Sequence, residues 1–151
     1  MRQYYVITII TLFTFTACGQ NHPKIQPATS GNMSARFDLF IVKEKFMRDS
    51  TIFYPGIADT ALQPVLTKKI NQAASDFRIT SMKSNVTDKD YQEQIKKGLS
   101  RFGDTYLDTE DRGRVCMYFE ELMDIVGLQS SGGLLNNFMY GFDPKDIKKK
   151  Q

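Results

Sequence analysis

The chain has 151 residues, of which 41% are hydrophobic, and a formal net charge of +3 at pH 7. This length suffices for one hydrophobic core of ordinary size, and no internal repeat or low-complexity block divides the chain. The charge is small and lacks the dense basic stripe typical of nucleic-acid-binding proteins, so we expect no nucleic-acid partner.

The start of the chain has the pattern of a bacterial signal peptide. An apolar run over residues 6–15 follows a short basic start, and the small residue Ala17 stands directly before Cys18. The run is shorter than the ~20 residues that a membrane-spanning helix needs. The arrangement resembles that of bacterial lipoproteins, although Phe15 departs from the usual aliphatic residue. We predict a signal peptide over residues 1–17, lipidation at Cys18 and a membrane-anchored location in the cell envelope; ordinary cleavage and a retained anchor are the alternatives.

Residues 18–32 are predicted to form the lipidated cysteine and a flexible tether, because this segment is polar and contains prolines and glycines. With Cys18 joined to lipid, Cys116 has no intramolecular partner and no CxxC metal pair exists. The single histidine, His22, lies in the tether, so Cys116 has no histidine base in the domain. We therefore interpret Cys116 as a small core residue.

The body of the chain, residues 33–144, is predicted to fold as one all-α domain, because its apolar residues recur at three- and four-residue spacing. The prediction is a bundle of four main helices plus a short C-terminal helix. Their expected ranges are 33–49, 63–79, 87–103, 108–126 and 134–140, and the run 39–42 also fits a strand. Residues 145–151 form a basic tail, which we interpret as a solvated end.

Local sequence signals mark several helix ends. Thr87 and the aspartate three residues later have the spacing of a capping box. Asp108 or Thr109 can cap the next helix, and Gly127 is placed to end it. Gly98 interrupts the helix that Thr87 begins, at a cost of about 1 kcal/mol relative to alanine. We predict that this glycine marks a close helix crossing.

The helix predicted over residues 108–126 organises the domain. On a helical wheel its apolar side chains fill an arc of roughly 180°, wide enough to pack against several neighbours. They are Val115, Cys116, Tyr118, Phe119, Leu122, Met123, Ile125 and Val126. The opposite face carries Glu120, Glu121 and Asp124. Met117 lies among these carboxylates, which indicates that another segment or a partner covers it.

An aromatic pair, Phe53 and Tyr54, precedes a Pro-Gly turn signal. Such a pair either forms an exposed contact patch or folds onto the core, and the second alternative is the more frequent one for aromatic residues in loops. The candidate interaction surface that we infer from the sequence comprises Tyr54, Met117, Glu120, Glu121 and Asp124.

No motif for a known chemistry is present in the sequence. The phosphate-binding, metalloprotease and hydrolase signatures are absent, and the acidic residues at positions 104–111 lack the spacing of a calcium loop. We therefore expect no cofactor and no metal. The favoured function is a non-enzymatic protein-interaction module of the envelope, bound to the membrane through its lipid and to an unknown envelope protein. The alternative is a small-ligand-binding protein or an enzyme that uses the helix-borne carboxylate cluster.

The segment YFEELMDIVGLQSSGGLLNNFMYGFDP, residues 118–144, resembles an uncharacterised bacterial family, Domain of Unknown Function 4844. Its members are small proteins typical of Bacteroidetes, and many carry lipoprotein signals. The resemblance extends from about residue 36 to Pro144. It implies a helical domain and an envelope location, and it implies no activity and no site residues.

Overall fold

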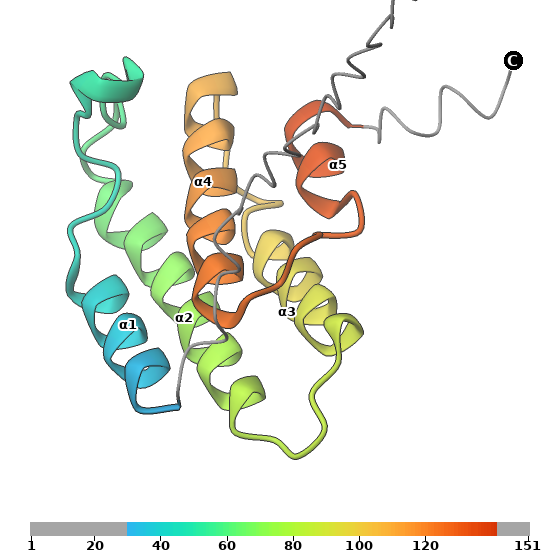
Figure 1. Cartoon of the computed structure of the whole chain (residues 1–151). Coiled ribbons are helices and arrows are strands. Elements are labelled where there is room, and N and C mark those ends of the chain that lie inside the picture. Colours follow the sequence, from blue (N-terminus) through green and yellow to red (C-terminus); the bar gives the residue numbers. More distant parts are fainter. Residues whose placement is uncertain (1–29, 142–151) are drawn as a thin grey trace, which may run out of the picture.

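The computed structural model describes residues 30–141, which form an all-α domain (Figure 1). This confirms the predicted bundle of four main helices and a short C-terminal helix. The elements in order are α1 (Ser30–Val42), the 3-10 turn η1 (Ser50–Ile52), α2 (Gln63–Ser81), α3 (Asp88–Ser100), α4 (Thr109–Val126) and α5 (Leu134–Tyr140). The predicted signal peptide, the lipidation site Cys18 and the basic tail lie outside the described residues.

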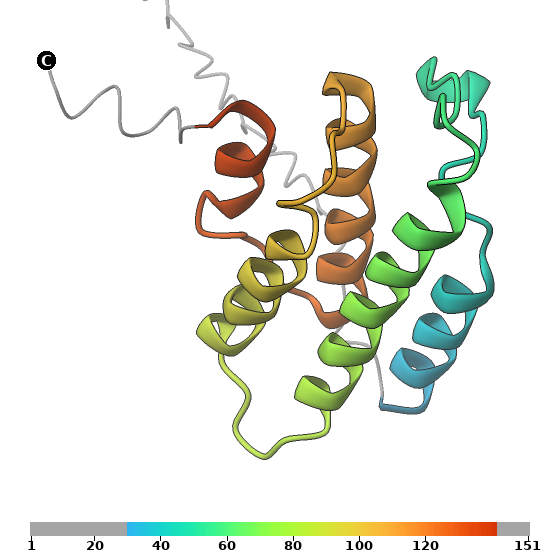
Figure 2. The ribbon, with the colours of Figure 1, turned by 180° about the vertical axis from the view of Figure 1, so that it is seen from behind.

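Helices α2 and α4 form the centre of the bundle. Helix α2 contacts α1, α3 and α4, whereas α4 contacts α1, α2 and α5. Figures 1 and 2 show α1 at one edge and α3 with α5 at the other, so that the two edges cover the sides of the central pair. The loop that contains η1 extends beyond the end of α1, beside the N-terminal half of α4 (Figure 1).

Aromatic side chains from all four main helices build the core. Tyr118 of α4 meets Phe40 and Phe46 edge to face, with ring centroids 6.3 Å and 5.2 Å apart. Phe77 stacks on Tyr91 at 5.7 Å, which joins α2 to α3. Such ring pairs add stability beyond the area that they bury. The apolar arc predicted for α4 faces this core, and only its members Cys116 and Val126 are half-buried.

The local signals for helix ends are confirmed. The Thr87 hydroxyl accepts a hydrogen bond from the backbone N–H of Asp90, and the Asp90 carboxylate accepts one from the backbone N–H of Thr87. Helix α4 is capped by Asp108, whose carboxylate accepts a 2.8 Å hydrogen bond from the N–H of Asp111. Gly127 ends α4 with a φ of 75°, which favours glycine.

Gly98 lies at a close crossing, as predicted. A Cβ atom on this glycine of α3 would lie 2.6 Å from Cζ of Phe119 in α4 and 3.3 Å from Cβ of Ala73 in α2. Carbon atoms in normal contact are about 3.5–4.0 Å apart. The missing side chain therefore lets α3 approach α2 and α4.

The first helix differs from its prediction at both ends. It begins at Ser30, inside the predicted tether, and ends at Val42, so the predicted helix over residues 43–49 was wrong. Phe46 adopts a φ of 60°, which a helix does not permit, and its N–H donates to the Tyr118 hydroxyl at 2.7 Å. This contact with α4 replaces the helical hydrogen bond. Leu39 and Val42, the two ends of the apolar run 39–42, are exposed.

Lys45 terminates α1 from inside the domain. Its side chain is 1% exposed, and Nζ donates to the carbonyl oxygens of Phe40 at 2.6 Å and Lys43 at 2.9 Å. The last carbonyls of a helix lack intrahelical partners, and a lysine ammonium satisfies them well. Desolvation by burial lowers the pKa of Lys45 from 10.5 to about 8, against the opposing effect of the nearby Glu121 charge.

Candidate functional site

A concave surface lies between η1 and the exposed face of α4. It consists of two adjoining hollows with volumes of about 360 Å³ and about 390 Å³. Ile52, Arg114 and Met117 line both hollows, and we call the combined surface the η1–α4 groove. The first hollow is mainly apolar, and its wall includes Phe53, Tyr54, Gly113 and Met139. The second is mainly charged, and its wall includes Lys43, Asp49, Glu120, Glu121 and Asp124.

Arg114 lies where the two hollows meet and joins the loop to α4. Its Nε donates to the Tyr118 hydroxyl at 3.1 Å, and its Nη1 donates to the Asp49 carboxylate at 3.3 Å. The guanidinium carbon lies 5.4 Å from the Tyr54 ring centroid and 5.0 Å from that of Tyr118, within the range of cation–π attraction. These bonds give Arg114 a structural role, because Asp49 already pairs with its charge.

The loop from Asp49 to Tyr54 is held by several bonds at once. The backbones of these two residues exchange two hydrogen bonds of 2.9 Å, which form an isolated antiparallel bridge. The Asp49 carboxylate caps η1 by accepting from the N–H of Thr51 at 3.2 Å and from its hydroxyl at 2.6 Å. The Thr51 hydroxyl bond, followed by the weaker effects of the Thr51 N–H and Arg114, lowers the pKa of Asp49. The loop is therefore a defined structure.

Tyr54 lies on the inner side of this loop. Its side chain is 4% exposed, and its hydroxyl donates to the Asp111 carboxylate at 2.7 Å. The placement of Tyr54 on an exposed contact surface was therefore wrong, and its ring instead forms part of the core beneath the groove. Burial, and then the bond to Asp111, raise the pKa of Tyr54. Burial also raises the pKa of Asp111, although the Tyr54 hydrogen bond opposes this change.

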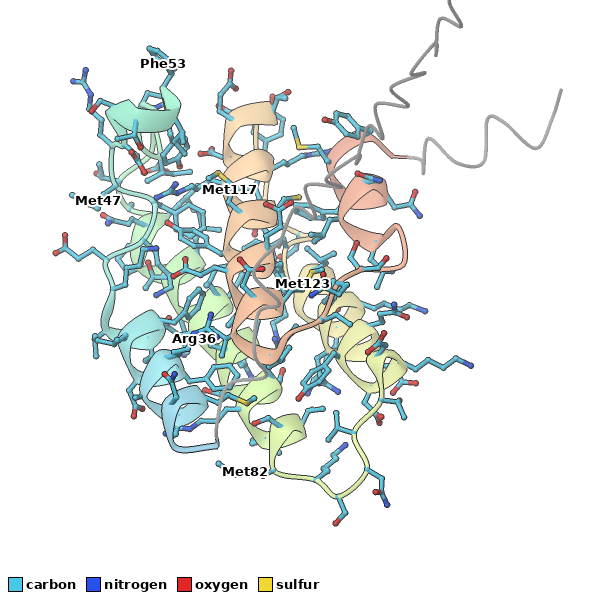
Figure 3. All side chains as sticks on the ribbon, in the orientation of Figure 1. Arg36, Met47, Phe53, Met82, Met117 and Met123 are labelled. Atoms are coloured by element: carbon cyan, nitrogen blue, oxygen red, sulfur yellow. The ribbon has the colours of Figure 1, made fainter. Side chains whose placement is uncertain are left out.

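Phe53, the other member of the aromatic pair, is the exposed residue. Its side chain is 92% exposed, and it ends η1 with a left-handed φ of 57°. Figure 3 shows it at the tip of the loop, in the same half of the domain as Met117 and at the opposite end from Met82. Composition does not say which member of an aromatic pair faces the core, and the left-handed backbone of Phe53 is a property of the folded loop, so the sequence pointed to Tyr54 instead of Phe53.

The other four predicted surface residues lie along the groove. Met117 is 38% exposed and lines both hollows. Glu121 forms a 2.8 Å ion pair with Lys43 of the segment after α1. Glu120 and Asp124 are exposed and form no hydrogen bond or ion pair with other residues of the described domain. The sequence placed Met117 and the carboxylates on one helix face, and the structure adds η1 and the Met139 side of α5 as the facing walls.

Cys116 is half-buried where α4 contacts α5. Its Sγ lies 3.7 Å from the carbonyl oxygen of Leu135, and burial raises its pKa to about 11. A raised pKa disfavours the reactive thiolate at neutral pH. The residues from 30 to 141 contain no group of three or more side chains that could hold a metal ion, and none of the helices in that range is long and apolar enough to cross a membrane.

A family model described as Domain of unknown function (DUF4844) matches residues 28–143. The chain belongs to the DUF4844 family, which confirms the resemblance inferred from residues 118–144.

The fold is also similar to that of a solved structure, the crystal structure of a DUF3571 family protein from Acinetobacter baumannii AYE. The two sequences are 31% identical and superpose with a TM-score of 0.68 over 80% of this chain and 96% of that chain. The comparison with curated proteins gave no match.

Proposed function

We propose that this protein is a lipid-anchored protein-interaction module of the bacterial cell envelope. The observation that supports this best is the display of Phe53 beside the apolar hollow of the η1–α4 groove. Phe53 and the apolar wall of the hollow together form a continuous apolar surface, and an exposed apolar patch of this kind marks a contact site for a partner. Met117 and Met139 continue the apolar wall, and methionine adapts its shape to different partners.

Support for the membrane anchor comes from the sequence pattern around Cys18. If this cysteine carries the lipid, the Cys18→Ser variant loses labelling by radioactive palmitate and moves from the membrane fraction to the soluble fraction. Continued labelling of Cys18→Ser would rule out acylation at this position. A Cys116→Ser variant is the matched control, and we expect it to remain labelled because Cys116 lies in the folded domain.

The interaction role is tested by crosslinking mass spectrometry on cells that express the tagged chain. We expect an envelope protein to be crosslinked to the wild-type chain and to be absent from the Cys18→Ser sample. The same set of crosslinked proteins in both samples would mean that anchoring does not bring the partner into reach. Recovery of no partner from the wild-type chain would contradict the interaction role.

A second candidate function is the binding of a small polar ligand, and one observation favours it. Glu120, Glu121 and Asp124 share a hollow of about 390 Å³ with Lys43 and Arg114, so opposite charges converge on one concave site. General acid catalysis requires a carboxyl group withdrawn from water, and two of these three carboxylates are exposed, which favours binding over catalysis. A thermal-shift screen with cationic and zwitterionic metabolites, repeated on a Glu120→Gln, Asp124→Asn variant, tests this candidate. If no metabolite in the screen changed the melting temperature, this candidate function would be ruled out.

A further inference from the structure

We infer that the η1–α4 groove binds a short segment of a partner protein in which a large apolar side chain is flanked by lysine or arginine. This inference rests on the proposed function, because it specifies the chemistry of the partner for the same surface. Three properties of the groove carry it: an apolar hollow, an excess of carboxylates beside that hollow, and a loop already fixed in its binding geometry.

The apolar hollow is the place for the anchor side chain. Its volume is about 360 Å³, and Ile52, Phe53, Met117 and Met139 supply apolar walls from three separate elements. The hollow is open to solvent on its outer side, so an apolar side chain that lies in it packs against these walls and is removed from water in part. Contact with the partner's remaining residues would complete the burial that the dominant residues of a protein interface require.

The charge of the groove determines what flanks the anchor. Five carboxylates line the two hollows, from Asp49, Glu110, Glu120, Glu121 and Asp124, whereas Lys43 and Arg114 are the cations. Both cations are already paired within the domain, with Glu121 and Asp49 respectively. The remaining carboxylates therefore give the groove a negative charge on a chain whose overall charge is +3. Complementary charge of this kind favours a basic partner and rejects acidic ones, which include nucleic acids and anionic membrane surfaces.

The loop that carries Phe53 is ready for binding before the partner arrives. Two backbone bonds between Asp49 and Tyr54, the Thr51 cap and the Arg114 ion pair hold it in place. A bulky residue with a φ of 57° is strained, and strain of this kind persists where the surroundings impose it and is frequent at binding sites. A preorganised loop loses little conformational entropy on binding. The entropy cost therefore cancels only a small part of the energy that Phe53 gains from contact with the partner.

Two other occupants are open to test against this inference. One is the C-terminal segment of the chain itself, because residues 142–151 combine Phe142 and Ile147 with four lysines. The other is a second copy of the chain. Either one would occupy the same groove. A truncated chain tests the first, and the dependence of the signals on protein concentration tests the second.

The experiment uses the full chain in a non-ionic detergent, labelled with ¹³C at the methionine methyl groups. The probe is the synthetic peptide Ac-KKFLKKG-amide, and the controls are the same peptide with glutamate for each lysine and with serine for phenylalanine and leucine. We expect the lysine peptide to shift the methyl signals of Met117 and Met139, which line the groove, and to leave that of Met82 unchanged. The expected dissociation constant is on the order of 10–100 µM at low salt, and it should rise with salt.

Two groove variants and one control variant complete the test. Phe53→Gly removes the aromatic ring beside the apolar hollow, so we expect the variant to bind the peptide about 10-fold more weakly. The change also removes the backbone strain at this position, so the variant should fold normally. Glu120→Gln combined with Asp124→Asn should weaken binding roughly 3- to 10-fold, as expected for the loss of two exposed ion pairs. Met82→Ala, which removes an exposed apolar side chain far from the groove, should change nothing.

Several results would contradict the inference. Equal binding of the lysine and glutamate peptides, or equal shifts at Met117 and Met82, would overturn the inference. Shifts of the Met117 signal caused by a stop codon after Gly141, without any peptide, would assign the groove to the chain's own tail instead. Shifts that follow protein concentration would assign it to a second copy. A negative peptide titration together with an envelope partner captured in cells would refute this chemistry and leave the interaction role standing.

Discussion

The close approach of three helices at Gly98 makes a specific prediction about stability. The Gly98→Ala variant places a Cβ atom 2.6 Å from Cζ and 2.8 Å from Cε1 of Phe119. The Phe119 ring is fully buried, so either this ring or the backbones of α3 and α4 must shift to make room. Overpacking of this kind costs about 1–3 kcal/mol, and the contacts here are short enough to indicate the upper half of that range.

Helix propensity acts in the opposite direction, because alanine is about 1 kcal/mol better than glycine inside a helix. The net expectation for Gly98→Ala is therefore a loss of about 1–2 kcal/mol in the free energy of unfolding. Gly113 in α4 is the matched control. A Cβ atom there would meet only Met139 Cε, at 3.8 Å, so Gly113→Ala should gain about 1 kcal/mol.

Urea unfolding of both variants, followed by circular dichroism at 222 nm, measures this contrast. A Gly98→Ala chain as stable as wild type, beside a stabilised Gly113→Ala chain, would refute the reasoning about the crossing. A double-mutant cycle with Phe119→Leu sharpens the test, because leucine removes the clashing ring atoms. The combined variant should be more stable than the sum of the two single changes predicts.

Three further predictions concern buried polar and sulfur groups. Tyr54→Phe removes the donor to the buried Asp111 carboxylate and should cost about 1–3 kcal/mol at pH 7 but less at pH 4. The Tyr54 hydroxyl bonds the charged form of Asp111 and therefore opposes the rise in pKa that burial causes. Since burial raises the pKa of Asp111, more of this carboxyl is protonated at pH 4 than at pH 7, and the protonated form loses less when the donor is removed. Lys45 has the opposite sign: its pKa is lowered to about 8, so wild type should gain about 2 kcal/mol over Lys45→Met between pH 7 and 9.5. Cys116→Ala should cost roughly 1–2 kcal/mol if the thiol packs as described.

Each of these predictions has a control or an outcome that contradicts it, measured by urea unfolding. Tyr106→Phe alters an exposed tyrosine and should be neutral at both pH values. An equal loss for Tyr54→Phe at pH 4 and pH 7 would show that the hydroxyl acts through packing alone. A pH-independent difference between wild type and Lys45→Met would show that the burial of Lys45 does not perturb its titration. An unchanged midpoint for Cys116→Ala would place this thiol at the surface.

The helix ends that could be predicted are those fixed by residues close in sequence. The Thr87–Asp90 capping box joins residues three positions apart, and Gly127 needs only its own left-handed backbone. The end of α1 could not be predicted in this way. It depends on the buried Lys45, which bonds the last carbonyls of the helix, and on the bond between the Phe46 N–H and the Tyr118 hydroxyl, whose residues are 72 positions apart. The periodic apolar residues of this segment continue past the point where that contact stops the helix.

In the candidate site, too, the features that depend on residues close in sequence could be predicted, and those that depend on tertiary contacts could not. Met117, Glu120, Glu121 and Asp124 share a helix face, and helical periodicity alone places them together. The facing wall depends on tertiary structure: the loop is positioned by Arg114 and Asp49, which are 65 residues apart. The sequence therefore predicted the residues on the α4 side of the groove. On the side of the loop it pointed to Tyr54, whereas Phe53 is the exposed member of the aromatic pair.

The central claim, that the η1–α4 groove receives a basic partner segment, is tested most directly by photo-crosslinking in cells. A benzoylphenylalanine at position 53 keeps an aromatic ring at the tip of the loop, and the same residue at position 82 is the control at the far end of the domain. The claim predicts a crosslinked partner from position 53 only, attached at a peptide with lysine or arginine beside a large apolar residue. Equal capture from both positions, or an acidic peptide at the crosslink, would contradict it.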